Sequence, residues 1–204
     1  MTPDPFTEHA SGSGGAPLVL AFDTSAAHCA AALVRDGGVL VQRDEPMARG
    51  QAERLIPLLE ELLAEAGHGW GDLDGLAVVT GPGNFTGQRL AVAAARGLAL
   101  GLGIPAVGVT VFEALADGHA GALTVLLHDK RGTLRQHFQD GAPLGEPEAG
   151  PAEATPATGE RADLATVAGI AARRLGAAPP PSPLYLRPAD ATPWSETVPL
   201  LDDA

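Results

Sequence analysis

The sequence is poor in positive charge. Of its 204 residues, 25 are acidic and 13 are basic, and only one of the basic residues is a lysine, so the formal net charge is −12 at pH 7. A protein that holds nucleic acid on its own surface gathers Lys and Arg into a patch. Here the densest basic cluster is the pair Arg173–Arg174. We therefore do not expect the chain to bind nucleic acid by itself.

The sequence also has few cysteines and no long apolar run. The single cysteine, Cys29, excludes an intrachain disulfide and fits a reducing compartment. The best apolar stretch, Leu90–Leu102, is shorter than the roughly 20 residues of a membrane span and contains Arg96. Residues 1–17 are acidic and then Gly/Ser-rich, without the apolar centre of a signal peptide. We predict a disordered extension at 1–17 and a cytoplasmic protein with no membrane contact.

The motifs of common hydrolases are absent. No two of the six histidines have the short helical spacing of a zinc pair, so no metal site is predicted. There is no Gly-x-Ser-x-Gly nucleophile motif, and the five serines suggest no catalytic triad. Cys29 lies in an Ala-rich apolar run, where a thiol is usually inert packing. No catalytic residue is therefore predicted.

Regular elements begin at Leu18. The run LVLAFDTS predicts a strand, and the turn Asp36-Gly37-Gly38 predicts that the next strands form antiparallel hairpins. Residues 52–66 have leucines at helical spacing, and we expect the regular helix to begin near Pro57, because proline is tolerated in the first turn. The remaining predicted elements are strand 76–80, helix 88–102, strand 106–111, helix 112–117, strands 122–127 and 133–139, loop 141–160 and helix 163–175.

Two segments at strand ends are candidates for ligand binding. Asp23-Thr24-Ser25 ends the first strand, and the Gly81–Gly87 loop leads from a buried strand into a helix, whose free N–H groups can hold an anion. A structural role is open for both: Asp, Thr and Ser also end strands, and the loop lacks the residues of a P-loop. The predicted cofactor-binding residues are Asp23, Thr24, Ser25, Gly81, Gly83, Thr86 and Gly87.

Two helices are candidates for partner binding. The leucines of 52–66 cover more than one narrow stripe, which fits either a core or an extra face for a partner. Ala93, Gly97 and Gly101 recur every four residues, which leaves a groove for another backbone. The predicted partner-binding residues are Leu55, Leu59, Leu62, Arg89, Ala93, Gly97 and Gly101.

In order along the chain, the segments LVLAFDTS, ERLIPLLEELL, GPGNFTGQRLAVAAARGLALGLGIPAVGV and PLYLR resemble the TsaB (YeaZ) family of tRNA threonylcarbamoyladenosine modification proteins. The resemblance is strongest over residues 18–115. The chain departs from the family pattern at Gln51, Ala52, Asn84, Gln88 and His128.

The resemblance implies an α/β fold of two ribonuclease-H-like subdomains, as in the actin, sugar-kinase and heat-shock ATPase superfamily, with the second one shortened. We expect an N-terminal subdomain over 18–108, a reduced C-terminal subdomain over 109–190 and a tail over 191–204. The partner-binding helices would lie in the N-terminal subdomain.

The resemblance also implies a non-catalytic scaffold subunit. It would pair with the TsaD transferase and the TsaE ATPase, form a homodimer when alone, and reach tRNA only through the complex. No cofactor is firmly implied, although ATP or ADP is a candidate ligand at the complex interface. The alternative is an enzyme of the same superfamily, either an ATP-dependent transferase or a peptidase.

Overall fold

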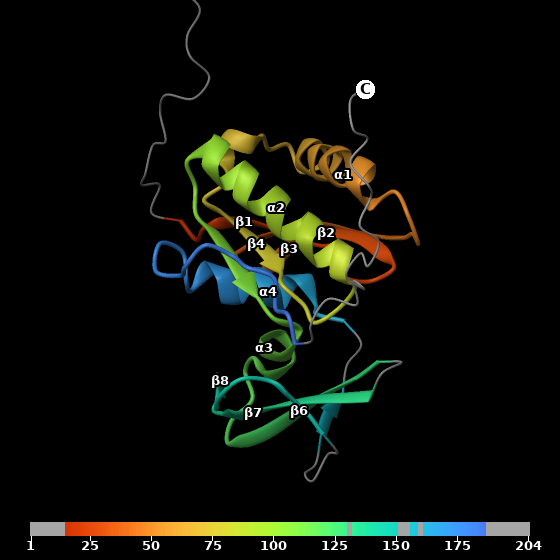
Figure 1. Cartoon of the computed structure of the whole chain (residues 1–204). Helices are drawn as coiled ribbons and strands as arrows, with labels where there is room; N and C mark the ends of the chain where they lie inside the picture. The colour runs from red at the N-terminus through yellow and green to blue at the C-terminus, as the bar shows by residue number, and fades with distance from the viewer. Residues whose placement is uncertain (1–14, 130–131, 151–155, 159–160, 187–204) are drawn as a thin grey trace, which may run out of the picture.

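The computed structural model describes residues 15–129, 132–150, 156–158 and 161–186. Most of the predicted N-terminal extension and the whole predicted tail at 191–204 lie outside these residues. The described chain forms two five-stranded sheets with helices around and between them (Figure 1).

The first sheet has the strand order β3-β2-β1-β4-β5. Strands β1 (Leu18–Asp23), β2 (His28–Arg35) and β3 (Gly38–Pro46) form the predicted antiparallel hairpins. The β2–β3 turn consists of Asp36 and Gly37, with φ of 52° and 70°, as a type I′ hairpin turn requires. Strands β4 (Gly75–Val79) and β5 (Ala106–Val109) run parallel to β1.

Helices cover both faces of this sheet. Helices α1 (Gln51–Glu65) and α2 (Phe85–Leu102) lie over one face, and α4 (Leu164–Ala172) lies under the other (Figure 1). A short 3₁₀ turn, η1 (Trp70–Asp72), leads from α1 into β4. Helix α1 begins at Gln51, so Pro57 lies inside it and the predicted start near Pro57 is wrong. The left-handed Gly50, with φ of 91°, instead turns the chain into the helix.

The leucines of α1 belong to the core of the chain itself. Leu55, Leu59 and Leu62 are at most 1% exposed and pack against the first sheet. Their assignment to a partner surface is therefore wrong, because side chains buried between α1 and the sheet cannot reach another protein.

The second sheet follows α3 (Val111–Ala116). Strands β6 (Ala122–Asp129) and β7 (Gly132–Gln139) pair antiparallel, and three short strands lengthen the sheet. These are β8 (Ala142–Pro143), β9 (Glu148–Ala149) and β10 (Pro156–Thr158). The sequence predicted a loop with little regular structure over 141–160, and in the described part of this range the regular structure is limited to these three short strands. Strands of two or three residues leave almost no periodic pattern in a sequence.

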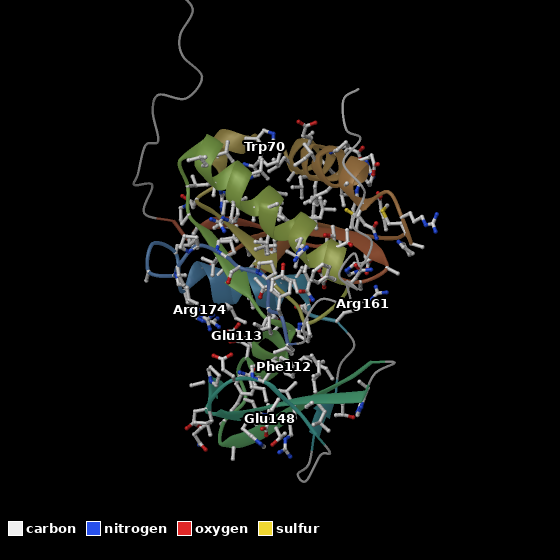
Figure 2. The ribbon with its side chains drawn as sticks, in the orientation of Figure 1. Trp70, Phe112, Glu113, Glu148, Arg161 and Arg174 are labelled. Atoms are coloured by element: carbon white, nitrogen blue, oxygen red, sulfur yellow. The ribbon has the colours of Figure 1, made fainter. Side chains whose placement is uncertain are left out.

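The fold is α/β and ribonuclease-H-like: three antiparallel strands are followed by two strands parallel to the first. One cluster of buried side chains is shared by both sheets, and Phe112 lies between them (Figure 2). Although α4 follows the second sheet in the chain, it packs on β1, β2 and β4. The division into subdomains at residue 108 remains a prediction. No helix within the described residues is long and apolar enough to cross a membrane.

Candidate functional site

The two predicted ligand-binding loops lie against each other at the ends of β1 and β4. Thr24 donates a hydrogen bond of 2.8 Å from Oγ1 to the carbonyl of Gly87. The amide of Asn84 donates one of 2.6 Å to the carbonyl of Ser25. A Cβ on Gly83 would lie 2.4 Å from the Ser25 carbonyl oxygen, and one on Gly87 would lie 1.9 Å from that of Thr24. Glycine is therefore required at both positions because two backbones approach closely.

The carboxylate of Asp23 is enclosed. Asp23 is 2% exposed, its Oδ1 accepts the Ser25 amide at 2.6 Å, and its Oδ2 lies 3.1 Å from Nε2 of His28. Both oxygens are thus bound within the chain and turned away from solvent. The sequence had suggested that this carboxylate was available to a nucleotide, but the structure uses it internally.

His28 is the residue that sequence reasoning missed. It is 3% exposed and lies between two carboxylates, with Nδ1 3.3 Å from Oδ1 of Asp44. The hydrogen bond with Asp23 raises the pKa of His28 above its ordinary value of 6.5, with the charges of Asp23 and Asp44 adding to the rise, while burial and the charge of Arg161 oppose it. Arg161 binds the other oxygen of Asp44 at 3.0 Å. The available signal was a histidine that opens the otherwise apolar strand HCAAALV.

The N-terminus of α2 is capped from within. Oδ1 of Asn84 accepts the amides of Thr86 at 2.9 Å and Gly87 at 3.2 Å, two of the N–H groups that an anion would use. The carbonyl of Gly81, where φ is 107°, accepts a hydrogen bond of 2.8 Å from the amide of Val111, the first residue of α3. The structure brings the predicted ligand residues together, and the polar groups described above bind within the chain.

A pocket of about 580 Å³ opens beside the ends of β4 and β5. A segment rich in proline, residues 179–185, forms one wall, and it is held by the amide of Leu184, which donates to the Thr80 carbonyl at 2.9 Å. Arg174 and Glu113 face each other in the lining and form an ion pair at 2.7 Å (Figure 2). Among the described residues, no group of three or more His, Cys, Asp or Glu side chains is placed to hold a metal ion.

Helix α2 exposes one continuous face, which we call the α2 outer face. It consists of Arg89, Ala93, Arg96, Gly97, Leu100 and Gly101. Leu100 is 87% exposed, and a Cβ on Gly97 or Gly101 would meet nothing within 4 Å. Four of the seven predicted partner residues, Arg89, Ala93, Gly97 and Gly101, lie together on this face.

An aromatic and cationic cluster lies at the start of the α2 outer face. The Arg89 guanidinium lies 3.7 Å from the ring centre of Phe85 and donates a hydrogen bond of 2.6 Å to the hydroxyl of Tyr185. The Phe85 and Tyr185 rings are 5.4 Å apart. These contacts fasten the 179–185 segment to the first turn of α2.

Comparison with known proteins identifies the family. The model described as "TsaD: tRNA N6-adenosine threonylcarbamoyltransferase" matches residues 25–130. The tRNA threonylcarbamoyladenosine biosynthesis protein TsaB of Escherichia coli K12 is 37% identical over 100 residues, which is 49% of this chain and 43% of that protein. A solved structure titled YeaZ from Pseudomonas aeruginosa covers 83% of this chain and 100% of its own, with a TM-score of 0.66 and 26% identity. The chain belongs to the TsaB (YeaZ) family.

The chain matches less than half the length of these TsaB relatives: the matched region spans 43% of the E. coli protein and 42% of that from Haemophilus influenzae. The matched family model is named for a transferase, and the tRNA N6-adenosine threonylcarbamoyltransferase of Cereibacter sphaeroides ATCC 17025 is 52% identical over 73 residues, 36% of this chain and 19% of that enzyme. Another Pseudomonas aeruginosa structure, titled an uncharacterized protein with similarity to peptidase YEAZ, gives a TM-score of 0.68 at 26% identity and covers 84% of this chain and 100% of its own.

Proposed function

We propose that this chain is a non-catalytic scaffold and activator subunit in the formation of N6-threonylcarbamoyladenosine in tRNA, acting in the cytoplasm. It pairs with a TsaD-type transferase and works with a TsaE-type ATPase. The names of the TsaB relatives and the transferase-type family model support this pathway. With a net charge of −12, the chain reaches tRNA through the complex and not through its own surface.

The observation that carries the docking proposal is the α2 outer face. Leu100, in the last turn of α2, is 87% exposed, while the opposite side of the helix is buried. The absence of side chains at Gly97 and Gly101 allows a second helix to approach closely. An exposed leucine beside two arginines and a small-residue groove fits a helix of a protein partner. In the absence of that partner, the same face of a second copy covers it in a homodimer.

The strand-end loops support the absence of catalysis by this subunit. The Asp23 carboxylate is held by His28 and the Ser25 amide, and the first amides of α2 are held by Asn84. A transferase that used Asp23 would need this carboxylate open to its substrate. ATP or ADP remains a candidate ligand at the interface with the partner, where residues of the partner would complete the binding site.

Size-exclusion chromatography with light scattering tests the pairing. The chain is measured alone, and then mixed with the TsaD-type transferase of the same organism, with the TsaE-type ATPase and ATP added in a second pass. We expect a homodimer alone, a one-to-one heterodimer in the mixture, and tRNA modification only when all components are present. No heterodimer at micromolar concentration would contradict the proposal.

A Gly97→Leu variant locates the docking face. The structure leaves room for the new side chain in the isolated chain, so the fold should persist while affinity for the transferase falls at least tenfold. Ala142→Leu, at an exposed position in the second sheet, is the matched control and should bind as the wild type does. Equal binding by both variants would mean that docking uses another surface.

A further inference from the structure

We propose that His28 is a positioning residue that fixes the start of α2 and thereby the α2 outer face. This inference rests on the proposed function for its consequence in docking, although its structural part can be tested on the chain alone. His28 lies on β2 and does not touch α2. It acts through two loops that are joined by hydrogen bonds.

The first step runs from His28 to the loop after β1. Nε2 of His28 lies 3.1 Å from Oδ2 of Asp23, and the other oxygen of this carboxylate accepts the Ser25 amide at 2.6 Å. Both side chains are nearly inaccessible, at 3% and 2% exposed. A buried carboxylate oxygen that loses its hydrogen-bond partner is costly to keep in place away from water. Without His28, the loop that carries Asp23 therefore loses one of the two contacts that hold this carboxylate.

The second step runs from this loop to α2. The Ser25 carbonyl accepts the Asn84 amide at 2.6 Å, and the Thr24 hydroxyl donates to the Gly87 carbonyl at 2.8 Å. The two backbones approach each other closely here, because a Cβ on Gly87 would lie 1.9 Å from the Thr24 carbonyl oxygen. Asn84 is the residue that caps α2. A displacement of the first loop is thus passed directly to the cap and first turn of the helix.

The third step is the support behind His28. Nδ1 of its ring faces Asp44 of β3 at 3.3 Å, and Asp44 is bound by Arg161, which precedes α4. The ring therefore has a carboxylate on a second side, on a neighbouring strand. Nδ1 makes no hydrogen bond, so this second contact is the charge attraction between a protonated ring and Asp44.

Amide hydrogen exchange on the full chain tests the structural part. In His28→Ala we expect amides of residues 86–90 to exchange at least tenfold faster than in the wild type, with β4 and the last turns of α2 unchanged. In His28→Gln the side-chain amide nitrogen takes the place of Nε2, so most of the protection should return. His128→Ala, which changes an exposed histidine of β6, is the matched control and should exchange as the wild type does.

Thr24→Val is the second variant, and it keeps the experiment decisive if His28→Ala does not fold. This substitution keeps the shape of the side chain but removes the hydroxyl that donates to the Gly87 carbonyl. The amides of residues 86–90 should then exchange faster, as in His28→Ala. The proposal is overturned if residues 86–90 exchange at the wild-type rate in folded His28→Ala or Thr24→Val, or if His28→Gln loses as much protection as His28→Ala.

Calorimetric titration with the TsaD-type transferase tests the consequence for docking. We expect His28→Ala to bind at least tenfold more weakly and His28→Gln to bind nearly as the wild type does. If the wild type does not bind while the exchange result holds, the proposed function fails and the positioning role stands. If the wild type binds and His28→Ala binds equally well, the link between His28 and docking is wrong.

Discussion

Thr24 and Gly87 are 63 positions apart in the chain, and a hydrogen bond of 2.8 Å joins the hydroxyl of one to the carbonyl of the other. The bond connects the end of β1 with the first turn of α2. It forms only because residue 87 has no side chain, since a Cβ there would overlap the Thr24 carbonyl. Gly87 is therefore needed because two backbones come into direct contact at this position.

Alanine substitutions at two glycines of α2 should have opposite effects. Gly87→Ala should destabilise the chain by several kcal/mol, because its Cβ would meet backbone at 1.9 Å and the loops would have to separate. Gly97→Ala, in the same helix with open space around it, should stabilise by about 0.5–1 kcal/mol. Urea unfolding followed by circular dichroism measures both. Equal stability of the two variants would contradict the close approach at Gly87.

Leu59→Ala should act on stability and not on association. Leu59 is fully buried, so we expect a loss of about 2–5 kcal/mol in the free energy of unfolding. Ile56→Ala, on the same helix but 37% exposed, is the control and should cost less than about 1 kcal/mol. At a temperature where both variants are folded, affinity for the transferase should be unchanged. A weaker affinity with unchanged stability would restore Leu59 to the partner surface.

The contribution of His28 to stability should depend on pH. Its pKa in the folded chain is raised above 6.5, chiefly by the hydrogen bond with Asp23 and with help from Asp44, against burial and Arg161. A raised pKa means that the stabilisation is complete below pH 6.5 and is lost as pH rises through the folded pKa.

Comparison with His28→Gln isolates this contribution, because the two proteins differ only at residue 28. The melting temperature of the wild type relative to His28→Gln should be highest near the acid end of a series from about pH 5 to about pH 9 and should fall toward the alkaline end. A difference that grows with pH would show that the folded chain prefers neutral His28.

The sequence predicted the first sheet and its helices well because their signals are local. Alternating and continuous apolar runs, the Asp36–Gly37 turn and the leucine spacing of α1 all lie within single elements. The N-cap of α4 is local as well: Asp163 accepts the Thr166 amide at 3.0 Å.

The candidate site depended on contacts between distant segments, and these left weaker signals. Spacing placed Ala93, Gly97 and Gly101 on one face of α2, but the leucines of α1 could be assigned to the core only once the sheet beneath them was known. The pairing of His28 with Asp23 needs the register of the β1–β2 hairpin and the third dimension of the loop. The sequence made the Asp23 carboxylate a candidate ligand, whereas its burial and its two contacts within the chain indicate a structural role.

The buried cluster that contains Val109, Phe112 and Phe138 runs without interruption from the α4 side of the first sheet to the second sheet. A two-lobed enzyme with a water-filled cleft can open and close on its substrate. An apolar junction opens only by exposing its surface to water, which costs a free energy of about 25 cal/mol for each Å² exposed. We therefore expect the two sheets to keep one relative position. A partner would meet a surface whose shape is set beforehand, and little conformational entropy would be lost when the two proteins associate.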